Sequence, residues 1–326
     1  MPYSVAANGV THILAEQEGW LADVCAERFP QWEALLDLGA IYLNKVRLRE
    51  NARVAVGDYI RLHPKPKRFA TAAVEWASRL VFVDPEFVIV NKPSGVPVHA
   101  TIDNLQENLI RALGSVVEGP LLVTHRLDTV TSGLVFLART PRAQRAFNRA
   151  LARGRVKKQY LALSSTAPVI GKWLHHMVRG EYAPKVLLRE ATAETQVCET
   201  DVSSVEVFGD CFETRLAPLT GRTHQLRTQM ALEGAAILGD EMYGGVPDSR
   251  FSLGKIALHA CRLEFVDTQN QLRTFEAPPA WRSEISREIL VSLTPVLRSE
   301  SSEFKQEQPA PHALACGNKT RRPGPQ

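Results

Sequence analysis

The residue types best suited to chemistry gather in one stretch, from Val123 to Thr140. Within eight residues it holds His125, Arg126, a single acid at Asp128 and three hydroxyl side chains. Apolar runs precede and follow these residues, with Gly133 at the return. Two short strand-like runs around a polar segment are typical of a catalytic loop at the edge of a sheet. A structural turn explains the same residues equally well, so the pattern alone leaves both interpretations open.

Motifs for other chemistries are missing from the sequence or incomplete. It contains no GxGxxG, no phosphate-binding loop and no cluster of metal ligands. His175 and His176 are adjacent, and neighbouring side chains of a strand point to opposite faces, so we expect no metal site there. Ser132 lacks a surrounding glycine elbow, which argues against a Ser-His-Asp triad. We therefore expect neither a metal nor an organic cofactor.

Composition sets broad limits on the fold and its surroundings. The 326 residues allow one large domain or two smaller ones. A net charge of +4 and a pI of about 8.8 are compatible with a polyanionic partner. Five scattered cysteines without a CxxC pair favour a reducing compartment. No secretory signal and no apolar run of the ~20 residues of a membrane helix are visible. We expect an intracellular, cytoplasmic protein without membrane contact.

Eight residues between His125 and Leu134 match, in order, the signature HRLDxxTSGL, and the segment thereby resembles the RluA-type RNA pseudouridine synthases. Other segments resemble further motifs of this family, and together they span about residues 80–280. These segments are Lys92–His99 (KPxGxxVH), Lys158–Ala162 (KxYxA), Pro218–Arg227 (PxTGRxHQLR), Gly239–Gly244 (GDxxYG) and Leu258–Ala260 (LHA).

The resemblance implies a role for each residue of the site. Asp128 would add to C1′ of the target uridine or remove its 2′ proton, and the sequence does not decide between the two routes. Arg227 would lie beside it as a fixed cation that keeps the acid ionised. Tyr160 would stack on the target base, and Leu226 would pack against it. Arg126 would fill the space left by the extruded nucleotide.

One departure from the family lies next to this arginine. Thr228 and Gln229 follow Arg227, where the family commonly has a histidine two residues further on. We expect a changed contact around the site and retained activity.

The start of the chain is predicted to form a small domain over residues 1–66. Helical patterns over Trp20–Phe29 and Trp32–Leu38 precede a hairpin at Ile41–Leu43, and this order resembles the S4-type RNA-binding domain. Basic residues cluster around the hairpin, and as a group they indicate phosphate binding, although any single one can belong to a solvated face. They are Lys45, Arg47, Arg49, Arg53 and Arg61.

Three further segments follow this domain. We expect a flexible linker over residues 67–78, a catalytic domain over 79–295 and a disordered tail over 296–326, where Ser, Glu, Pro and Lys occur without periodicity. Within the catalytic domain, the pattern predicts helices over Asn104–Leu113 and Pro141–Arg153. The arginines of the second helix form either an RNA-binding ridge or a solvated face. Residues 171–184 show no clear pattern.

The resemblance implies an α+β fold with a mixed, mostly antiparallel sheet bent around a catalytic cleft. It also implies a monomeric isomerase that converts uridine to pseudouridine in ribosomal or transfer RNA. Two other functions compete: a non-catalytic RNA-binding protein on the same fold, and a hydrolase in which Asp128 and His125 activate water. The intact Asp128, Tyr160 and Arg227 argue against the first. The missing second acid and missing metal ligands argue against the second.

Overall fold

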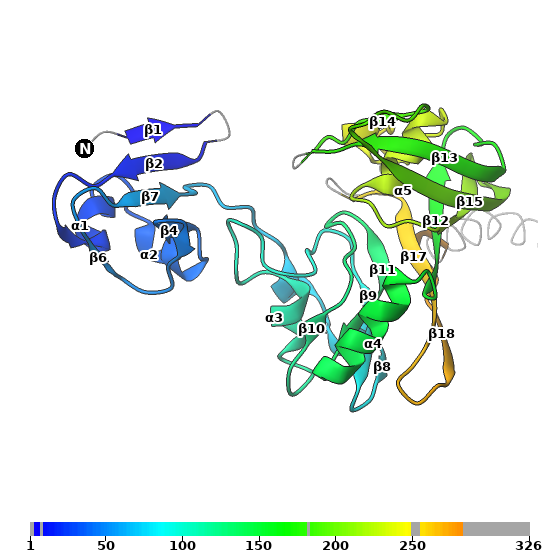
Figure 1. Ribbon diagram of the computed structural model, residues 1–326, viewed down its shortest axis with the longest axis horizontal. Helices are drawn as coiled ribbons and strands as arrows, with labels where there is room; N and C mark the ends of the chain where they lie inside the picture. The colour runs from blue at the N-terminus through cyan, green and yellow to red at the C-terminus, as the bar shows by residue number, and fades with distance from the viewer. Residues whose placement is uncertain (1–2, 7–8, 181–182, 249–254, 283–326) are drawn as a thin grey trace, which may run out of the picture. The chain divides into compact units, whose positions relative to one another are not determined.

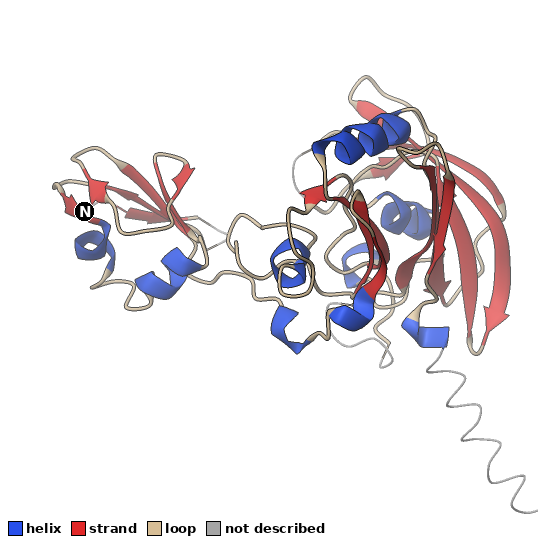
Figure 2. Cartoon of the chain, turned by 90° about the horizontal axis from the view of Figure 1, so that it is seen from below, coloured by secondary structure: helices blue, strands red, loops and turns tan. Residues whose placement is uncertain are grey.

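The computed structural model describes residues 3–6, 9–180, 183–248 and 255–282 (Figure 1). Residues 1–279 form one compact unit, and the described residues 280–282 belong to a second. Strands make up most of the regular structure (Figure 2). The expected tail at 296–326 lies outside the described residues, as does the end of the expected catalytic domain.

The first elements form a five-stranded sheet with two short helices. The strands pair in the order β1-β2-β7-β4-β5, and β3 and β6 form a separate pair. The bounds are β1 Tyr3–Val5, β2 Thr11–Leu14, β3 Gly19–Trp20, α1 Leu21–Cys25, α2 Trp32–Asp37, β4 Ile41–Leu43, β5 Val46–Arg47, β6 Arg53–Val54 and β7 Tyr59–Leu62. The two predicted helices and the hairpin are confirmed, although α1 is shorter than expected. The likeness to an S4-type domain stays a prediction.

The second sheet carries the sequence motifs. Its eleven strands follow the order β14-β13-β15-β16-β12-β17-β11-β9-β8, with β10 beside β11 and β18 beside β17. The bounds are β8 Leu80–Val83, β9 Phe87–Lys92, β10 Leu122–Val123, β11 Ser132–Ala138, β12 Lys157–Ser164, β13 Gly171–Val178, β14 Leu187–Leu188, β15 Thr195–Phe208, β16 Cys211–Pro218, β17 Leu258–Val266 and β18 Leu272–Glu276. Only β11 and β17 are parallel among the pairings of this sheet, which confirms the mixed, mostly antiparallel α+β fold.

Gly133 makes the parallel pairing of β11 with β17 possible. Its φ is +113°, and a Cβ atom at this position would lie 2.4 Å from the backbone nitrogen of Ala260. A side chain would therefore push the two strands apart, and the left-handed φ is open mainly to glycine. The two strands hold Ser132 and His259 opposite each other, directly after the Asp128 loop.

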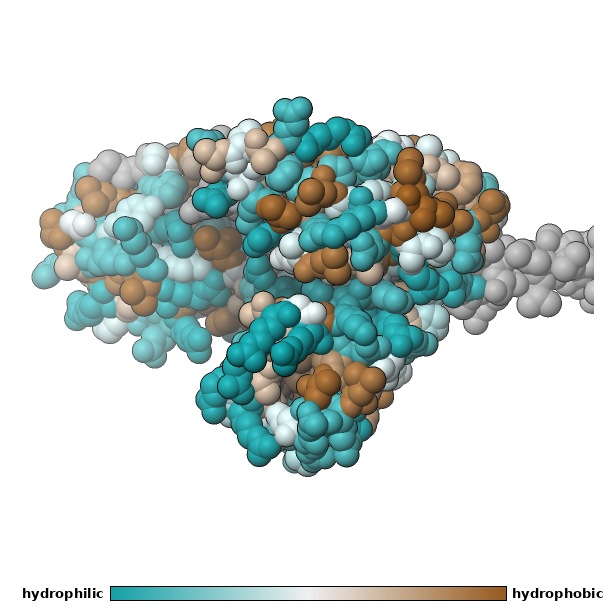
Figure 3. Space-filling model, turned by 45° about the vertical axis from the view of Figure 1, so that its right-hand side comes forward, coloured by the Kyte–Doolittle hydropathy of each residue, from teal (hydrophilic) through white to brown (hydrophobic). Residues whose placement is uncertain are grey.

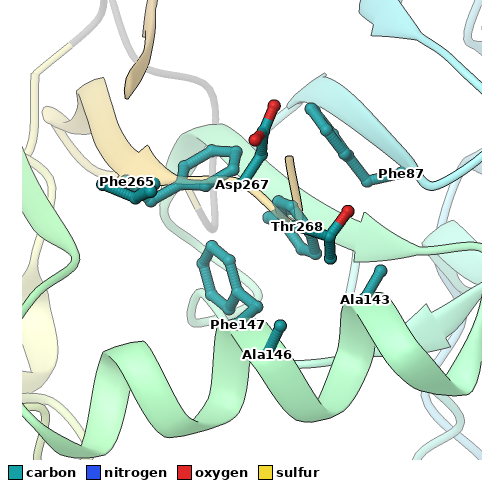
Figure 4. A pocket seen from close by; sticks show the side chains of 9 residues that line it. Phe87, Ala143, Ala146, Phe147, Phe265, Asp267 and Thr268 are labelled. Atoms are coloured by element: carbon teal, nitrogen blue, oxygen red, sulfur yellow. The ribbon is translucent and has the colours of Figure 1, made fainter. Parts of the chain in front are cut away.

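Helix α4, Pro141–Ala152, covers an aromatic core next to these strands. Thr140 Oγ1 accepts the Ala143 N–H at 3.1 Å as the N-cap, and Pro141 occupies the first turn. Phe147 of the helix stacks on Phe136 of β11 with ring centroids 4.0 Å apart, and Phe265 packs edge-on against both rings. Figure 4 shows Phe147 and Phe265, with Phe87, around a small pocket whose lining also includes Phe136. The predicted helix over Pro141–Arg153 is confirmed.

Two sequence predictions need correction. The helix expected over Asn104–Leu113 is limited to α3, Leu109–Leu113, because Asn108 is the N-cap and Asn104 instead binds the N–H groups of Gln106 and Glu107. The segment without a clear pattern begins with a regular strand, β13, which alternates buried and more exposed residues and pairs with β15 over its whole length.

Residues of the expected linker contain two short 3₁₀ helices, η1 Thr71–Ala73 and η2 Ala77–Arg79. The Lys67 N–H donates to Asp103 at 2.8 Å, and Arg68 pairs with Glu107 at 2.5 Å. Flexibility of this segment stays a prediction.

The described surface is largely polar. Figure 3 shows hydrophilic residues over most of one face, with hydrophobic residues in separate small patches. Among the helices that the structure describes, none is both long and apolar enough to cross a bilayer.

Candidate active site

Asp128 lies on the loop between β10 and β11, and neighbouring backbone groups fix that loop. The Thr131 N–H donates to the Asp128 carbonyl at 3.1 Å, which closes a tight turn. From the loop after β9, the Gly95 N–H donates to the Thr129 carbonyl at 2.8 Å, and the Ser94 hydroxyl donates to the Val130 carbonyl. The KPxG segment therefore forms the support beneath the Asp128 turn.

Lys92 completes this support from inside the fold. Its side chain is fully buried, and its ammonium donates to the carbonyls of Pro93, Val96 and Thr129 at 3.0, 2.8 and 3.3 Å. Burial lowers the pKa of Lys92 to about 7, and the negative charge of Asp128 opposes this shift. The lysine thus ties the loop that carries Asp128 to the preceding loop.

Arg227 reaches the Asp128 carboxylate from helix α5, Gln225–Leu232. Its NH1 lies 3.7 Å from Asp128 Oδ2, while its Nε and NH2 donate to both oxygens of Asp240 at 2.7 and 2.8 Å. Burial opposes the charged guanidinium, but the hydrogen bonds and charge of Asp240, with that of Asp128, raise the pKa of Arg227. The bidentate pair fixes the orientation of the cation, and its remaining side faces Asp128.

His224 and Tyr243 line the same corner. His224, in the left-handed region with φ +59°, precedes α5, and its Nε2 lies 4.0 Å from Asp128 Oδ2. Its Nδ1 is hydrogen bonded to the Tyr243 hydroxyl at 2.7 Å. The Arg227 guanidinium lies over the Tyr243 ring at 4.9 Å from its centroid. Burial lowers the pKa of His224, so the imidazole is neutral at pH 7 and adds no fixed charge.

The other predicted site residues differ in how exposed their side chains are to solvent. Tyr160 of β12 is buried, and both burial and the charge of Asp128 raise the pKa of its phenol, so the ring stays neutral. Leu226 is buried next to Arg227 in α5. Arg126 is exposed, and its NH1 lies 3.2 Å from His99 Nε2. Among the described residues, neither Arg126 nor Leu226 forms a hydrogen bond or ion pair with Asp128.

Ser132 and His259 form a pair that could be mistaken for a nucleophile and its base. The His259 Nε2 lies 3.0 Å from the Ala277 carbonyl, which can only accept, so Nε2 carries the proton and Nδ1 accepts from the Ser132 hydroxyl at 2.8 Å. Burial lowers the pKa of His259 to about 4. Such an imidazole is a poor base at pH 7. The pair joins β11 to β17 through a hydrogen bond.

Gln229, which departs from the family motif, is fully buried in a polar network. Its Oε1 accepts from Thr200 Oγ1 at 2.7 Å, and its amide nitrogen lies 3.2 Å from His175 Nδ1. His175 Nε2 is in turn 3.0 Å from Glu233. The glutamine therefore anchors α5 to β13 and β15 two residues after Arg227.

The arrangement provides one reactive group in a rigid frame. The side chain of Asp128 is 26% exposed, whereas that of Asp240 is 2% exposed and has both oxygens occupied by Arg227. A carboxylate that is open on one side and flanked by a fixed cation can act as a nucleophile or as a base. Among the described residues, no group of three or more His, Cys, Asp or Glu side chains is placed to hold a metal.

Comparison with known proteins agrees with this geometry. A family model described as RNA pseudouridylate synthase matches residues 86–232. A protein of Zymomonas mobilis, named as an uncharacterized RNA pseudouridine synthase, is 32% identical over 213 residues, which cover 62% of this chain and 94% of that one. The chain belongs to the RluA-type RNA pseudouridine synthase family.

Other relatives differ in how much of their length this chain covers. The chloroplastic RNA pseudouridine synthase 6 of Oryza sativa is 32% identical over 220 residues, 59% of this chain and 46% of that protein. This chain thus spans about half the length of that relative. Ribosomal large subunit pseudouridine synthase C of Escherichia coli is 29% identical over 272 residues, 75% of this chain and 82% of that one.

A solved structure supports the fold alone. Human RNA pseudouridylate synthase domain containing 4 superposes with a TM-score of 0.52 at 22% identity, over 63% of this chain and 90% of that one.

Three residues that build this site, Lys92, Asp240 and Tyr243, were not among the site residues predicted from the sequence. Asp240 and Tyr243 belong to the GDxxYG segment, whose resemblance to the family was the available signal. Lys92 belongs to the KPxGxxVH segment, but nothing in the sequence indicates that its ammonium is buried beneath the Asp128 loop.

Proposed function

We propose that this chain is an RNA pseudouridine synthase that isomerises specific uridines, with Asp128 as its reactive carboxylate. The observation that carries the proposal is the position of Asp128 Oδ2, 3.7 Å from a guanidinium that is itself fixed by a buried acid. The partial exposure of Asp128 leaves one side open to a nucleotide. The family membership supplies the reaction type.

The reaction needs one well-placed acid and no electron transfer. The bond from ribose C1′ to N1 breaks, the base turns, and C1′ bonds to C5, while C5 loses a proton and N1 gains one. Asp128 either adds to C1′ or removes the 2′ proton, and both routes require it ionised. The positive charge of Arg227 favours that form.

The remaining site residues bind the extruded nucleotide in this proposal. The Tyr160 ring, neutral and buried on β12, offers a face on which uracil can stack in any rotational state. Leu226 packs against the base. Arg126, exposed on the loop beside His99, occupies the gap that the nucleotide leaves in the RNA.

Ribosomal RNA is the substrate class we favour. The Escherichia coli relative, whose name specifies the large ribosomal subunit, aligns over 75% of this chain. Transfer RNA remains the second class to test. Lys45 in the turn between β4 and β5, Arg49 after β5 and Arg53 in β6 are exposed and can add phosphate contacts to either. A monomer that acts in a reducing, intracellular compartment stays a prediction.

The test is pseudouridine mapping on unmodified ribosomal and transfer RNA. The purified chain and its Asp128→Asn variant, which keeps the shape of the side chain, are incubated with each RNA and read by carbodiimide-stop primer extension. We expect a stop at a defined uridine with the unchanged chain and none with the variant. Asp201→Asn, at a position on β15 outside this site, is the matched control and should give the stop.

Two results would contradict the proposal. A stop with Asp128→Asn as strong as with the unchanged chain would remove Asp128 from the chemistry. RNA binding without any stop would favour the non-catalytic RNA-binding protein, for which the exposed basic residues are the supporting observation.

A further inference from the structure

Three lysines near the site differ in how their charge is satisfied. Lys92 is fully buried, and three carbonyls surround its ammonium. Lys157 is exposed and pairs with Glu264 at 2.8 Å. Lys158 is partly buried, yet it forms no hydrogen bond or ion pair with any residue that the structure describes. A structural lysine would resemble Lys92 and a solvated one Lys157, so Lys158 needs a different explanation.

The position of Lys158 connects it to the candidate active site. It precedes Tyr160 by two residues on β12, which lies between β16 and β17, and the pairing of β12 with β17 shifts register between Gln159 and Tyr160. Its Nζ would lie 3.8 Å from a Cβ atom built at Gly221, in the loop that leads to His224 and α5. On the other side, its charge lowers the pKa of His125. The ammonium therefore lies beside the loop that leads to His224 and Arg227.

An unpaired cation in this position carries an energetic cost that a ligand can remove. Partial burial withdraws water from the ammonium and lowers the pKa of Lys158, because no acid among the described residues compensates the charge. An anion that enters with the substrate would restore the charged form. RNA supplies one anion per nucleotide in its phosphate backbone, and a lysine binds phosphate as a compact point charge.

We propose that Lys158 binds a backbone phosphate of the RNA next to the extruded uridine and so positions its ribose over Asp128. This inference rests on the proposed function, since the RNA that it binds is the substrate of that site. It assigns to Lys158 the role of a positioning residue, because the lysine contacts the phosphate and not the reacting atoms. It also explains why Lys158 forms no hydrogen bond or ion pair with the part of the chain that the structure describes.

The test compares three variants. Lys158→Met removes the charge but keeps the length and apolar stem, Lys158→Arg keeps the charge, and Lys157→Met removes a charge from the adjacent residue, whose partner is Glu264. Filter binding of an unmodified large-subunit ribosomal RNA transcript is measured from low to high salt, in an Asp128→Asn background so that the RNA is not converted. Turnover is measured in parallel with Asp128 intact.

For Lys158→Met we expect binding to weaken about 10- to 100-fold, the range for loss of a hydrogen bond to a charged group. The slope of log K against log salt should become shallower by about 0.7–0.9, which corresponds to one phosphate contact. Lys158→Arg should keep the slope. Lys157→Met should also keep it, because its charge is already paired with Glu264.

Three outcomes would overturn the proposal. An unchanged salt slope for Lys158→Met would exclude a phosphate contact, even if turnover fell, and would favour a contact to the base. An equal loss of slope in Lys157→Met would show a general charge effect. A slope lost in Lys158→Arg as well would point to a packing role. Absence of turnover in the unchanged chain would refute the proposed function, and the salt slopes would still decide whether Lys158 contacts phosphate.

Discussion

Helices α4 and α5 pack on the same sheet and bury opposite kinds of residue. Helix α4 buries Ala143 and Phe147, and its other face is exposed and basic. Helix α5 buries Gln225, Arg227, Thr228 and Gln229 together with two apolar residues. Apolar contacts are not directional, so α4 gains stability without fixing any atom closely. Buried polar side chains need hydrogen-bond partners in fixed positions, so the packing of α5 fixes the orientation of Arg227.

The partners of α5 show how this orientation arises. Gln225 accepts from the Thr220 hydroxyl at 2.8 Å and donates to Thr200 at 3.1 Å, and Gln229 accepts from Thr200 at 2.7 Å. Arg227, between the two glutamines, is fixed by Asp240. A rotation of the helix would break several of these bonds at once. We therefore infer that the apolar contacts of α4 contribute mainly to stability, and that the polar contacts of α5 fix the position of the Arg227 guanidinium.

The largest expected effect is that of Arg227→Met. Loss of the cation beside Asp128 should lower turnover by about 10²–10³-fold, the range for removal of one electrostatic group from an active site. Asp240 would be left buried without its partner, and the free energy of unfolding should fall by about 3–5 kcal/mol. Pseudouridine mapping and urea unfolding measure the two effects separately.

The double variant Arg227→Met with Asp240→Leu is the control for this prediction. Because an apolar pair can replace a buried ion pair at little cost, the double variant should recover most of the stability but none of the turnover. Recovery of turnover together with stability would show that Arg227 contributes only to folding.

A smaller effect, and on stability alone, is expected from Phe265→Ala in the aromatic core beneath α4. Removal of a ring that packs on Phe87, Phe136 and Phe147 should lower the free energy of unfolding by about 3–5 kcal/mol. Turnover per folded molecule should stay unchanged, because this cluster does not contact Asp128. Phe265→Leu, which keeps most of the volume, should cost about 1.5 kcal/mol or less. A loss of turnover in folded Phe265→Leu would contradict the separation of the two sides.

The same contrast explains what the sequence could predict. Helix α4 was predicted at nearly its observed bounds, because Pro141 in the first turn and arginines at helical spacing are local signals. Asp128 and Arg227 came from motif resemblance, and the structure brings them within 3.7 Å of each other. The pairing of Arg227 with Asp240 could not be derived, because it depends on tertiary contacts between residues thirteen positions apart.

Two other regions were harder to predict for the same reason. The strand β13 was missed because it holds polar residues such as His175 at buried positions, where they bind α5. The helix expected from Asn104 begins only after Asn108, because asparagine side chains there bind backbone N–H groups. Only the asparagine bonds compete locally with regular structure, whereas those of His175 are tertiary contacts.

The smallest expected effect concerns the pH dependence of stability on the α4 side. His125 lies against Phe147 with ring centroids 5.7 Å apart, and its Nε2 accepts the Phe136 N–H at 3.0 Å. Burial, with the charge of Lys158 second, lowers the pKa of His125 to about 3. The unfolded chain, with a histidine pKa of about 6.5, therefore binds more protons than the folded one between these values.

It follows that His125 stabilises the fold above about pH 6.5, and that this stability is lost as the pH falls toward 3. The slope from one such histidine is at most about 1.4 kcal/mol per pH unit. His125→Gln, which keeps an acceptor for the Phe136 N–H, should reduce the slope of unfolding free energy between pH 4 and 6 by up to that amount. Urea unfolding across the pH range measures it, and the unchanged slope above about pH 7, where histidine does not titrate, is the internal control. If the variant kept the wild-type dependence of unfolding free energy on pH, protonation of His125 would not limit stability. The aromatic core beneath α4 would then have to tolerate a charged imidazole beside Phe147.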